Sequence, residues 1–223
     1  MKLFVSGTDT QVGKTLVSCL ALQALQREGL AAVGMKPVAA GMSPDGTWDD
    51  VEQLRKASSV TAPLEDVAPY RLHAAASPHF AAREQSVVVR LELVLSALER
   101  LERLAAWVVI EGVGGFRVPL SEQLDSASLA QAIGAPVLLV VRMRLGCINH
   151  ALLSAEAIAR RGLPLAGWVA NAGLDSDYGR VPQTVETLCH SLDAPCLAVL
   201  PYVAPALRDS VTLDIGRLMQ RLH

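Results

Sequence analysis

The sequence predicts an α/β fold in which a doubly wound, mainly parallel sheet is flanked by helices on both faces. Two observations support this prediction: short, β-branched apolar runs recur along the chain, and helical patterns separate them. Runs that are hydrophobic almost throughout are typical of strands buried on both faces, as in parallel sheets. Strands that alternate with helices indicate right-handed βαβ crossovers, which build a doubly wound sheet.

The apolar runs predict the strands, and the longer patterns between them predict the helices. Strands are expected at Leu3–Ser6, Ala31–Met35, Trp107–Glu111, Pro136–Val141, Leu165–Asn171 and Cys196–Leu200. Helices are expected at Lys14–Glu28, Asp50–Ala57, Leu91–Leu104, Ser126–Ile133, Asn149–Arg161, Val181–Leu192 and Leu213–Leu222. The segments Gly41–Trp48 and Thr61–Ser86 interrupt the alternation, and we expect active-site loops there. Because no linker or repeat divides the chain, residues 1–223 are expected to form a single domain.

Composition excludes several classes of partner. The chain has 223 residues, 51% of them hydrophobic, and a formal net charge of −2. Nucleic-acid-binding domains usually carry a strong basic excess, so no nucleic-acid partner is expected. The longest uniformly apolar run, Ala135–Val141, is far too short to span a bilayer, and we expect no membrane partner.

The N-terminus and the cysteines predict where the protein works. Residues 1–5 run directly into a strand, with no apolar signal region. Cys19, Cys147, Cys189 and Cys196 show neither a CxxC pair nor a spacing suited to zinc. Structural thiols in a reducing compartment, and hence a cytoplasmic location, are therefore expected.

The segment Gly7–Thr15, Gly-Thr-Asp-Thr-Gln-Val-Gly-Lys-Thr, follows the first strand and opens the first helix, as a phosphate-binding loop requires. Glycine lets backbone N–H groups approach phosphate oxygens, and the helix N-terminus attracts anions. Lys14 is expected to reach the β- and γ-phosphates, and the Thr15 hydroxyl to bind Mg²⁺. Thr8 stands where the standard motif has its first glycine. A chance Gly-Lys-Thr is the alternative, but the flanking strand and helix favour a P-loop NTPase-like fold.

Charged residues follow two other predicted strands at the same edge of the sheet. Glu111 ends an apolar strand, where a carboxylate of a phosphate-loop enzyme would position Mg²⁺; a solvated glutamate is the alternative. Asp49 and Asp50 open a helix, and for this pair alone an N-cap is the favoured interpretation. Lys36 follows the second strand and would stabilise negative charge on a substrate or phosphoryl group. The alternative there is a solvated lysine before a proline.

Further segments follow the same pattern along nearly the whole chain: beside the phosphate loop Gly7–Thr15 there are Lys36–Ala39, Ser77–His79, Val109–Gly112, Leu145–Ala151 and Ala166–Asn171. Together and in this order, these segments resemble the dethiobiotin synthetase family. Many NTPases share the phosphate loop, whereas Lys-Pro-Val and Leu-Gly-Cys-Ile-Asn-His are more specific. The threonine in place of the first loop glycine is also typical of this family.

The resemblance implies a reaction and its central residues. ATP, CO₂ and 7,8-diaminopelargonate would give dethiobiotin, ADP and phosphate through a carbamate and a carbamic–phosphoric anhydride. Lys14 and Lys36 would be catalytic. Thr15, Glu111 and Asp50, which the family register favours over Asp49, would hold the Mg²⁺ cofactor.

The resemblance also implies the binding residues. The ATP site would comprise Gln11, Val12, Gly13, Lys14, Thr15, Leu16, Asp50, Glu111, Gly112, Val113, Gly114, Asn171, Ala172, Leu200, Pro201 and Tyr202. The substrate site would comprise Lys36, Ala40, Gly146, Cys147, Ile148 and Asn149. Three positions depart from common family residues: Gln11 replaces glutamate, Ala40 replaces serine, and Ala172 replaces aspartate. They affect the expected affinity and nucleotide preference, not the reaction class.

The segment Leu145–His150 opens a helix whose unpaired N–H groups suit an anion. By resemblance it would receive the substrate carboxylate across a homodimer interface, although an ordinary helix start is the alternative.

Two rival functions belong to other classes. Partition or division ATPases carry an extra lysine five positions before the invariant one, where this chain has Asp9. The tail Leu213–Leu218 also lacks the strong basic charge of a membrane-targeting helix. Small-molecule kinases and cobyrinate-type amidating ligases form the second rival, but the latter need a glutaminase domain for which we expect no room.

Overall fold

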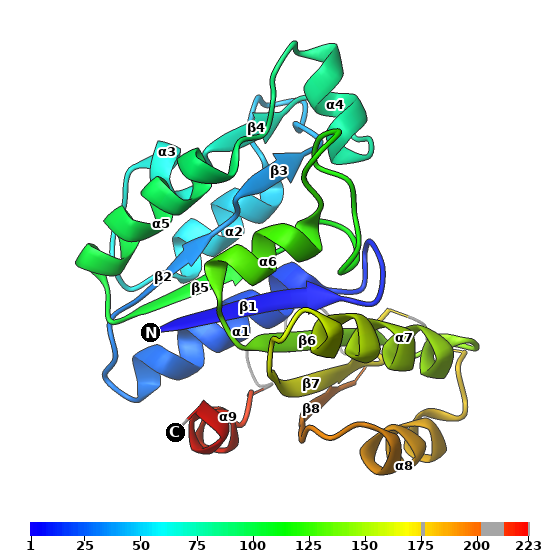
Figure 1. Ribbon diagram of the computed structural model, residues 1–223. Helices are drawn as coiled ribbons and strands as arrows, with labels where there is room; N and C mark the ends of the chain where they lie inside the picture. The colour runs from blue at the N-terminus through cyan, green and yellow to red at the C-terminus, as the bar shows by residue number, and fades with distance from the viewer. Residues whose placement is uncertain (175–176, 202–211, 223) are drawn as a thin grey trace.

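The computed structural model describes residues 1–174, 177–201 and 212–222. Its main sheet runs in the order β2-β5-β1-β6-β7-β8, and every neighbouring pair is parallel. The strands are β1 (Lys2–Gly7), β2 (Ala32–Met35), β5 (Trp107–Glu111), β6 (Val137–Arg142), β7 (Leu165–Asn171) and β8 (Cys196–Leu200). All point toward the right of Figure 1, so their carboxyl ends share one edge. The predicted parallel sheet is therefore confirmed.

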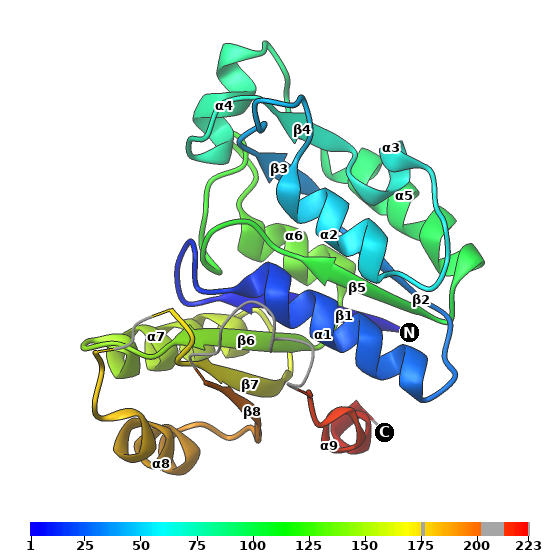
Figure 2. The same ribbon diagram turned by 180° about the vertical axis from the view of Figure 1, so that it is seen from behind.

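Helices cover both faces of this sheet, as predicted. Figure 2 shows α1 (Lys14–Arg27), α2 (Asp49–Ala57) and α9 (Ile215–Leu222) toward the viewer. The opposite face carries α5 (Leu91–Leu104), α6 (Ser126–Ile133), α7 (Cys147–Arg160) and, packed beside α7, α8 (Val181–Ser191). Side chains alternate across a strand, so Phe4 joins one core cluster while Leu3 and Val5 join the other. Both clusters are apolar, which explains the continuous hydrophobicity of the strands.

The segment Thr61–Ser86, expected as a loop, contains regular structure. It holds α3 (Leu64–Val67), β4 (Tyr70–Leu72) and α4 (Pro78–Glu84), and β4 pairs in parallel with β3 (Val38–Ala40). This small sheet extends from the carboxyl end of β2 (Figure 1). Strands of three residues and helices of four and seven residues are too short for a readable period, so sequence analysis missed them.

Several helix boundaries differ from the prediction by one or two residues. Helix α7 begins at Cys147 rather than Asn149, α2 at Asp49 rather than Asp50, and α9 at Ile215 rather than Leu213. No helix in the described part of the chain is long and apolar enough to cross a membrane.

Candidate active site

The phosphate loop joins β1 to α1, and its backbone is left-handed at Gln11 and Gly13. Gln11 has φ 55° and Gly13, the N-cap of α1, has φ 96°. Glycine is required at position 13 for a second reason, because a Cβ there would overlap the side-chain amide of Asn171. Among the described side chains none caps the start of α1. Its first N–H groups therefore remain suited to phosphate oxygens.

Lys14 is buried at the base of this loop. Its ammonium donates to the carbonyl of Asp9 at 3.0 Å. Burial lowers the pKa of Lys14 from 10.5 to about 8, and the neighbouring charge of Lys36 acts in the same direction. A desolvated ammonium of this kind favours an anion as its partner.

Lys36 lies between two carboxylates. Its Nζ is 2.6 Å from Glu111 Oε1 and 2.9 Å from Asp50 Oδ2, and it also donates to the carbonyl of Gly112 at 3.2 Å. The Thr15 hydroxyl donates to the same Glu111 oxygen at 3.0 Å. Burial acts to lower the pKa of Lys36, but the charges and hydrogen bonds of Glu111 and Asp50 outweigh it and raise the pKa. Lys36 is therefore a buried ammonium that two anionic partners stabilise.

Strand register brings these residues together. Met35 of β2 pairs with Ile110 of β5, so Lys36 and Glu111 emerge side by side at the carboxyl edge. Both side chains are buried, with 4% and 1% of their residues' surface exposed, which excludes the solvated alternatives considered for each.

Helix α2 decides between the two aspartates. Its N-cap is Trp48, so the hypothesis that Asp49 or Asp50 is the N-cap is wrong; the helix begins one residue earlier than expected. Asp50 reaches Lys36, whereas Asp49 accepts a hydrogen bond from the Ser43 hydroxyl at 3.0 Å. Only Asp50 joins the buried cluster.

The same cluster offers oxygen ligands that fit Mg²⁺. Glu111 Oε2 is buried and has no hydrogen-bond partner among the described residues, so this carboxylate has capacity for a further ligand. Thr15 and Asp50 supply two more oxygens beside it. Mg²⁺ is usually bound by one or two carboxylates together with substrate phosphates and water. No group of three or more His, Cys, Asp or Glu side chains suited to a metal occurs in the described residues, so the remaining ligands would come from nucleotide and water.

The expected adenine site lies at the ends of β7 and β8. Asn171 ends β7, Leu200 ends β8, and the Ala172 N–H donates to the Leu200 carbonyl at 2.9 Å. Asn171 is 1% exposed, and its side chain bonds to the protein: Nδ2 donates to the Val12 carbonyl at 2.8 Å, and Oδ1 accepts from Gly173 N–H at 3.0 Å. Pro201 follows β8 directly, and Tyr202 lies outside the described residues.

The segment expected to contact substrate starts α7. Gly146 is the N-cap with φ 91°, and no described side chain caps this helix start. Gly146 follows β6, whereas Lys36 follows β2, and the strands β5 and β1 lie between β6 and β2. The ends of β6 and β2 are therefore three strand spacings, or about 14 Å, apart. Sequence analysis missed Arg144, whose guanidinium contacts the Asp9 carboxylate at 3.1 Å and links this segment to the phosphate loop.

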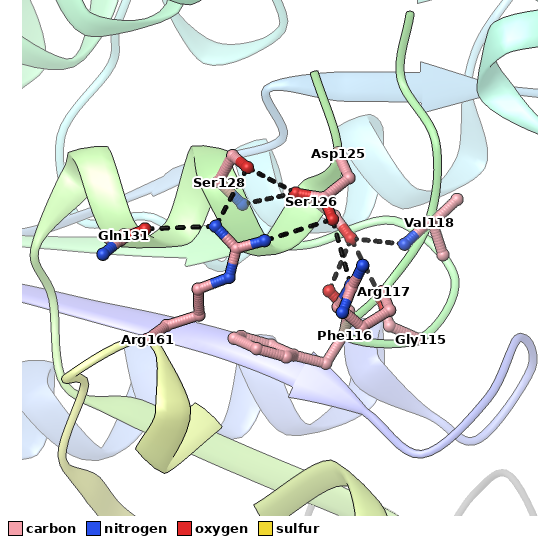
Figure 3. Close-up of polar contacts among 9 residues, drawn as sticks. All are labelled: Gly115, Phe116, Arg117, Val118, Asp125, Ser126, Ser128, Gln131 and Arg161. Atoms are coloured by element: carbon pink, nitrogen blue, oxygen red, sulfur yellow. Dashed lines mark hydrogen bonds and ion pairs between the residues drawn. The ribbon is translucent and has the colours of Figure 1, made fainter. Parts of the chain in front are cut away.

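The loop after Glu111 is held by the start of α6 (Figure 3). The Ser126 hydroxyl donates to the Phe116 carbonyl at 2.7 Å and accepts from Val118 N–H at 2.9 Å. Asp125 caps α6 by accepting from Ser128 N–H. Sequence analysis missed this anchor, although Asp-Ser-Ala-Ser before an apolar helix is a recognisable N-cap signal.

Asp125 also carries two ion pairs, with Arg117 at 3.0 Å and Arg161 at 3.5 Å (Figure 3). Burial acts to raise its pKa, but the Ser128 hydrogen bonds and the two arginine charges hold the pKa below its ordinary value.

This loop packs against the phosphate loop. A Cβ at Gly115 would lie 3.6 Å from the Gly7 carbonyl oxygen, so the two backbones pass close together. A cavity of about 370 Å³ opens beside them. Its lining includes Thr8–Thr10 of the phosphate loop, 115–118 of the second loop, and Leu153, Ser154 and Ala157 of α7.

A phosphate loop at the carboxyl edge of a parallel sheet, with a buried carboxylate on the neighbouring strand, defines a P-loop ATP-binding protein. A family model described as an AAA domain matches residues 1–208. Proteins named ATP-dependent dethiobiotin synthetase BioD are similar over nearly the whole chain. The protein of Aromatoleum aromaticum is 50% identical over 206 residues, 91% of each chain. That of Ralstonia nicotianae is 50% identical over 223 residues, 98% of this chain and 97% of the relative. The chain belongs to the family of ATP-dependent dethiobiotin synthetases.

Solved structures share the fold at low identity. The septum site-determining protein MinD of Pyrococcus horikoshii, complexed with Mg-ADP, has a TM-score of 0.60 and 17% identity, covering 97% of this chain and 89% of its own. A ParA family ATPase of Chlorobium tepidum has a TM-score of 0.57 and 10% identity, covering 99% and 98%. These likenesses show the fold alone. The family membership, not the fold, argues against the partition and division function.

Proposed function

We propose that residues 1–223 act as one domain that binds ATP and Mg²⁺ and converts 7,8-diaminopelargonate and CO₂ into dethiobiotin, ADP and phosphate. As a family member, the chain is an ATP-dependent ligase of biotin biosynthesis. The observation that carries the proposed site is the buried contact of Lys36 with Glu111 and Asp50, beside the phosphate loop. Together with Lys14 and Thr15, these three residues lie at the edge of the sheet where α/β proteins bind their ligands.

The reaction needs positive charge where phosphoryl transfer occurs. One substrate amine attacks CO₂ and loses a proton, which gives a carbamate. A carbamate oxygen attacks the γ-phosphorus, the bond to the ADP oxygen breaks, and a carbamic–phosphoric anhydride forms. The second amine then attacks the carbonyl carbon, loses a proton and expels phosphate. Lys14 and Lys36 would orient the oxygens and neutralise the charge that spreads over them.

Thr15, Asp50 and Glu111 would hold Mg²⁺. Bound there, Mg²⁺ would neutralise negative charge on the phosphate oxygens. The Thr15 hydroxyl supports this assignment, as does Glu111 Oε2, which has no hydrogen-bond partner in the part of the chain that the structure describes.

The nucleotide would lie along the phosphate loop toward the ends of β7 and β8. Residues Gln11–Leu16 would contact the phosphates together with Gly112, Val113 and Gly114. Asn171, Ala172, Leu200, Pro201 and Tyr202 would surround the base, with Asn171 as its reader. The closeness of the phosphate loop to β7, through the Asn171–Val12 hydrogen bond, supports this path. ATP is the expected nucleotide.

The substrate would bind between two copies of the chain, in a cytoplasmic homodimer. Lys36 and Ala40 of one protomer would face Gly146–Asn149 of the other. An uncapped helix start suits the substrate carboxylate. Leu145 and Leu153 are 90% and 56% exposed, so the α7 region presents apolar surface that a second copy would cover.

Incubation with 7,8-diaminopelargonate, ATP, Mg²⁺ and ¹³C-bicarbonate, followed by mass spectrometry, tests the function. We expect labelled dethiobiotin only when ATP and Mg²⁺ are both present. ATP consumption without a labelled ureido product would refute the proposed reaction.

A further inference from the structure

Asn171 makes a contact that a base reader does not need. It ends β7, 159 residues from Val12 in sequence, and its amide nitrogen donates to the Val12 carbonyl at 2.8 Å. The other end of the carboxamide accepts from Gly173 N–H at 3.0 Å, and the Asn171 carbonyl accepts from Met143 N–H at 2.9 Å. The side chain is thus fixed at both ends and oriented toward the phosphate loop.

The part of the loop that Asn171 contacts is conformationally costly. Val12 lies between Gln11, a non-glycine residue with φ 55°, and Gly13 with φ 96°. Left-handed backbone persists in a non-glycine residue only where its surroundings enforce it. The Val12 side chain is buried in the core cluster on the α1 face, and the Asn171 amide holds its carbonyl. The packing of the Val12 side chain and the hydrogen bond to the Val12 carbonyl therefore restrain the loop at residues 11–13.

The restraint sets the direction of a backbone N–H group. The described residues contain no cis peptide bond, so the Val12 carbonyl and the Gly13 N–H point in opposite directions. With the carbonyl directed at Asn171, the Gly13 N–H points away from β7. Backbone N–H groups of this loop are the donors that suit phosphate oxygens.

We propose that Asn171 is a positioning residue for the polyphosphate site: its carboxamide holds the Val12–Gly13 peptide in the orientation that phosphate binding needs. The inference rests on the proposed ATP site but extends the role of Asn171 beyond the base. The two roles are chemically compatible, because an amide has a second N–H and a second acceptor lone pair. They differ in what they affect: a base reader discriminates nucleotides, whereas a positioning residue acts on any polyphosphate.

Inorganic tripolyphosphate, which has neither base nor sugar, separates the two roles. In Asn171→Ala the buried Val12 carbonyl loses its donor, and we expect tripolyphosphate affinity, measured by calorimetry with Mg²⁺, to fall about tenfold. The kcat/KM values for ATP and for GTP should both fall by a similar factor. Any loss of base reading would appear in addition, as a change in the ratio of the two values. Asn171→Leu has nearly the shape of asparagine but neither its donor nor its acceptor, so it tests the same contact without a cavity and without adding a charge.

Thr184→Val is the matched control. Thr184 is also buried, and its hydroxyl bonds to Tyr178 at 2.8 Å, away from the phosphate loop. This variant should lose stability without losing tripolyphosphate affinity. Wild-type tripolyphosphate affinity in both Asn171 variants would overturn the inference, and a change in the ATP/GTP ratio alone would leave Asn171 a base reader only. Neither result bears on whether the wild type makes dethiobiotin, which the labelled-bicarbonate assay decides.

Discussion

Lys36 Nζ and Glu111 Oε1 lie 2.6 Å apart in a buried ion pair, and the same carboxylate oxygen accepts the Thr15 hydroxyl at 3.0 Å. One oxygen atom therefore serves both the lysine after β2 and the threonine of the phosphate loop. With Asp50 as its second partner, the Lys36 ammonium is already the counter-ion of the two carboxylates that would hold Mg²⁺. Lys36 and a metal ion compete for the same negative charge.

Replacing Lys36 by methionine tests this competition. The variant keeps an apolar stem but leaves Glu111 and Asp50 without their counter-ion, so we expect Mn²⁺ to bind the ADP complex at least about tenfold more tightly. Electron paramagnetic resonance of free Mn²⁺ measures that affinity. Breaking a buried pair typically costs about 3–5 kcal/mol, so the metal-free variant should also melt earlier and gain more from Mg²⁺ than the wild type.

Lys2→Met provides the control for the Lys36 variant. Lys2 forms a surface pair with Glu102 at 3.6 Å; it begins β1, at the edge of the sheet opposite to the site. It should leave the Mn²⁺ affinity unchanged. Equal or weaker metal binding in Lys36→Met would contradict the shared-charge interpretation.

Lys14→Ala should reduce turnover by several orders of magnitude. Removing one preorganised donor from a transition state commonly costs about 10²–10³-fold, and Lys14 is also the main charged partner of the phosphates. Formation of dethiobiotin at saturating ATP measures the loss. Lys56→Ala, an exposed lysine on α2, should retain wild-type turnover. Near-normal turnover in Lys14→Ala would remove Lys14 from the catalytic set.

Gly146→Glu should weaken binding of 7,8-diaminopelargonate with little effect on ATP, because the new carboxylate repels that of the substrate. A raised KM for the diamine and an unchanged KM for ATP are the expected readouts. Gly162→Glu is a close control: both glycines have positive φ, 91° and 68°, and a Cβ at either position would have no atom of the described residues within 4 Å. Equal effects of the two substitutions would show backbone strain rather than charge.

Light scattering tests the shared site directly. We expect a dimer at assay concentration. A fully active monomer would overturn the proposal that Gly146–Asn149 act in the partner's site.

Asp125→Asn should remove stability that depends on pH. The folded-state pKa of Asp125 is lowered, so its contribution is complete above the unfolded pKa, about 3.9, and is lost as pH falls through the folded pKa. Asparagine caps helices as well as aspartate, so the substitution removes mainly the pairs with Arg117 and Arg161. The difference in Tm between wild type and variant should be largest near pH 6–7 and should vanish once the pH lies below the folded-state pKa of Asp125.

Asp193→Asn serves as the comparison for Asp125. Asp193 pairs with Arg221 at 3.3 Å but is fully exposed, so its substitution should change Tm little at any pH. A constant Tm difference across the pH range for Asp125→Asn would contradict a role for its charge.

Local patterns were sufficient for much of the fold. Trp107–Glu111 and Leu165–Asn171 were predicted to the residue, because an apolar run bounded by polar or turn residues marks a strand buried on both faces. The strands Val38–Ala40 and Tyr70–Leu72 were missed, since three residues carry no readable period. Their pairing depends on a contact between distant segments.

The sequence by itself determined the phosphate loop, the strand ends where functional residues stand, and the family. Those features are encoded in contiguous residues. Only the tertiary structure decided that Asp50 rather than Asp49 reaches Lys36, that Lys36 lies between two carboxylates, and that Asn171 holds Val12. These contacts join separate strands and helices, so they depend on strand order, register and the rotation of α2. No local pattern specifies those quantities, because they are set by how the whole core packs.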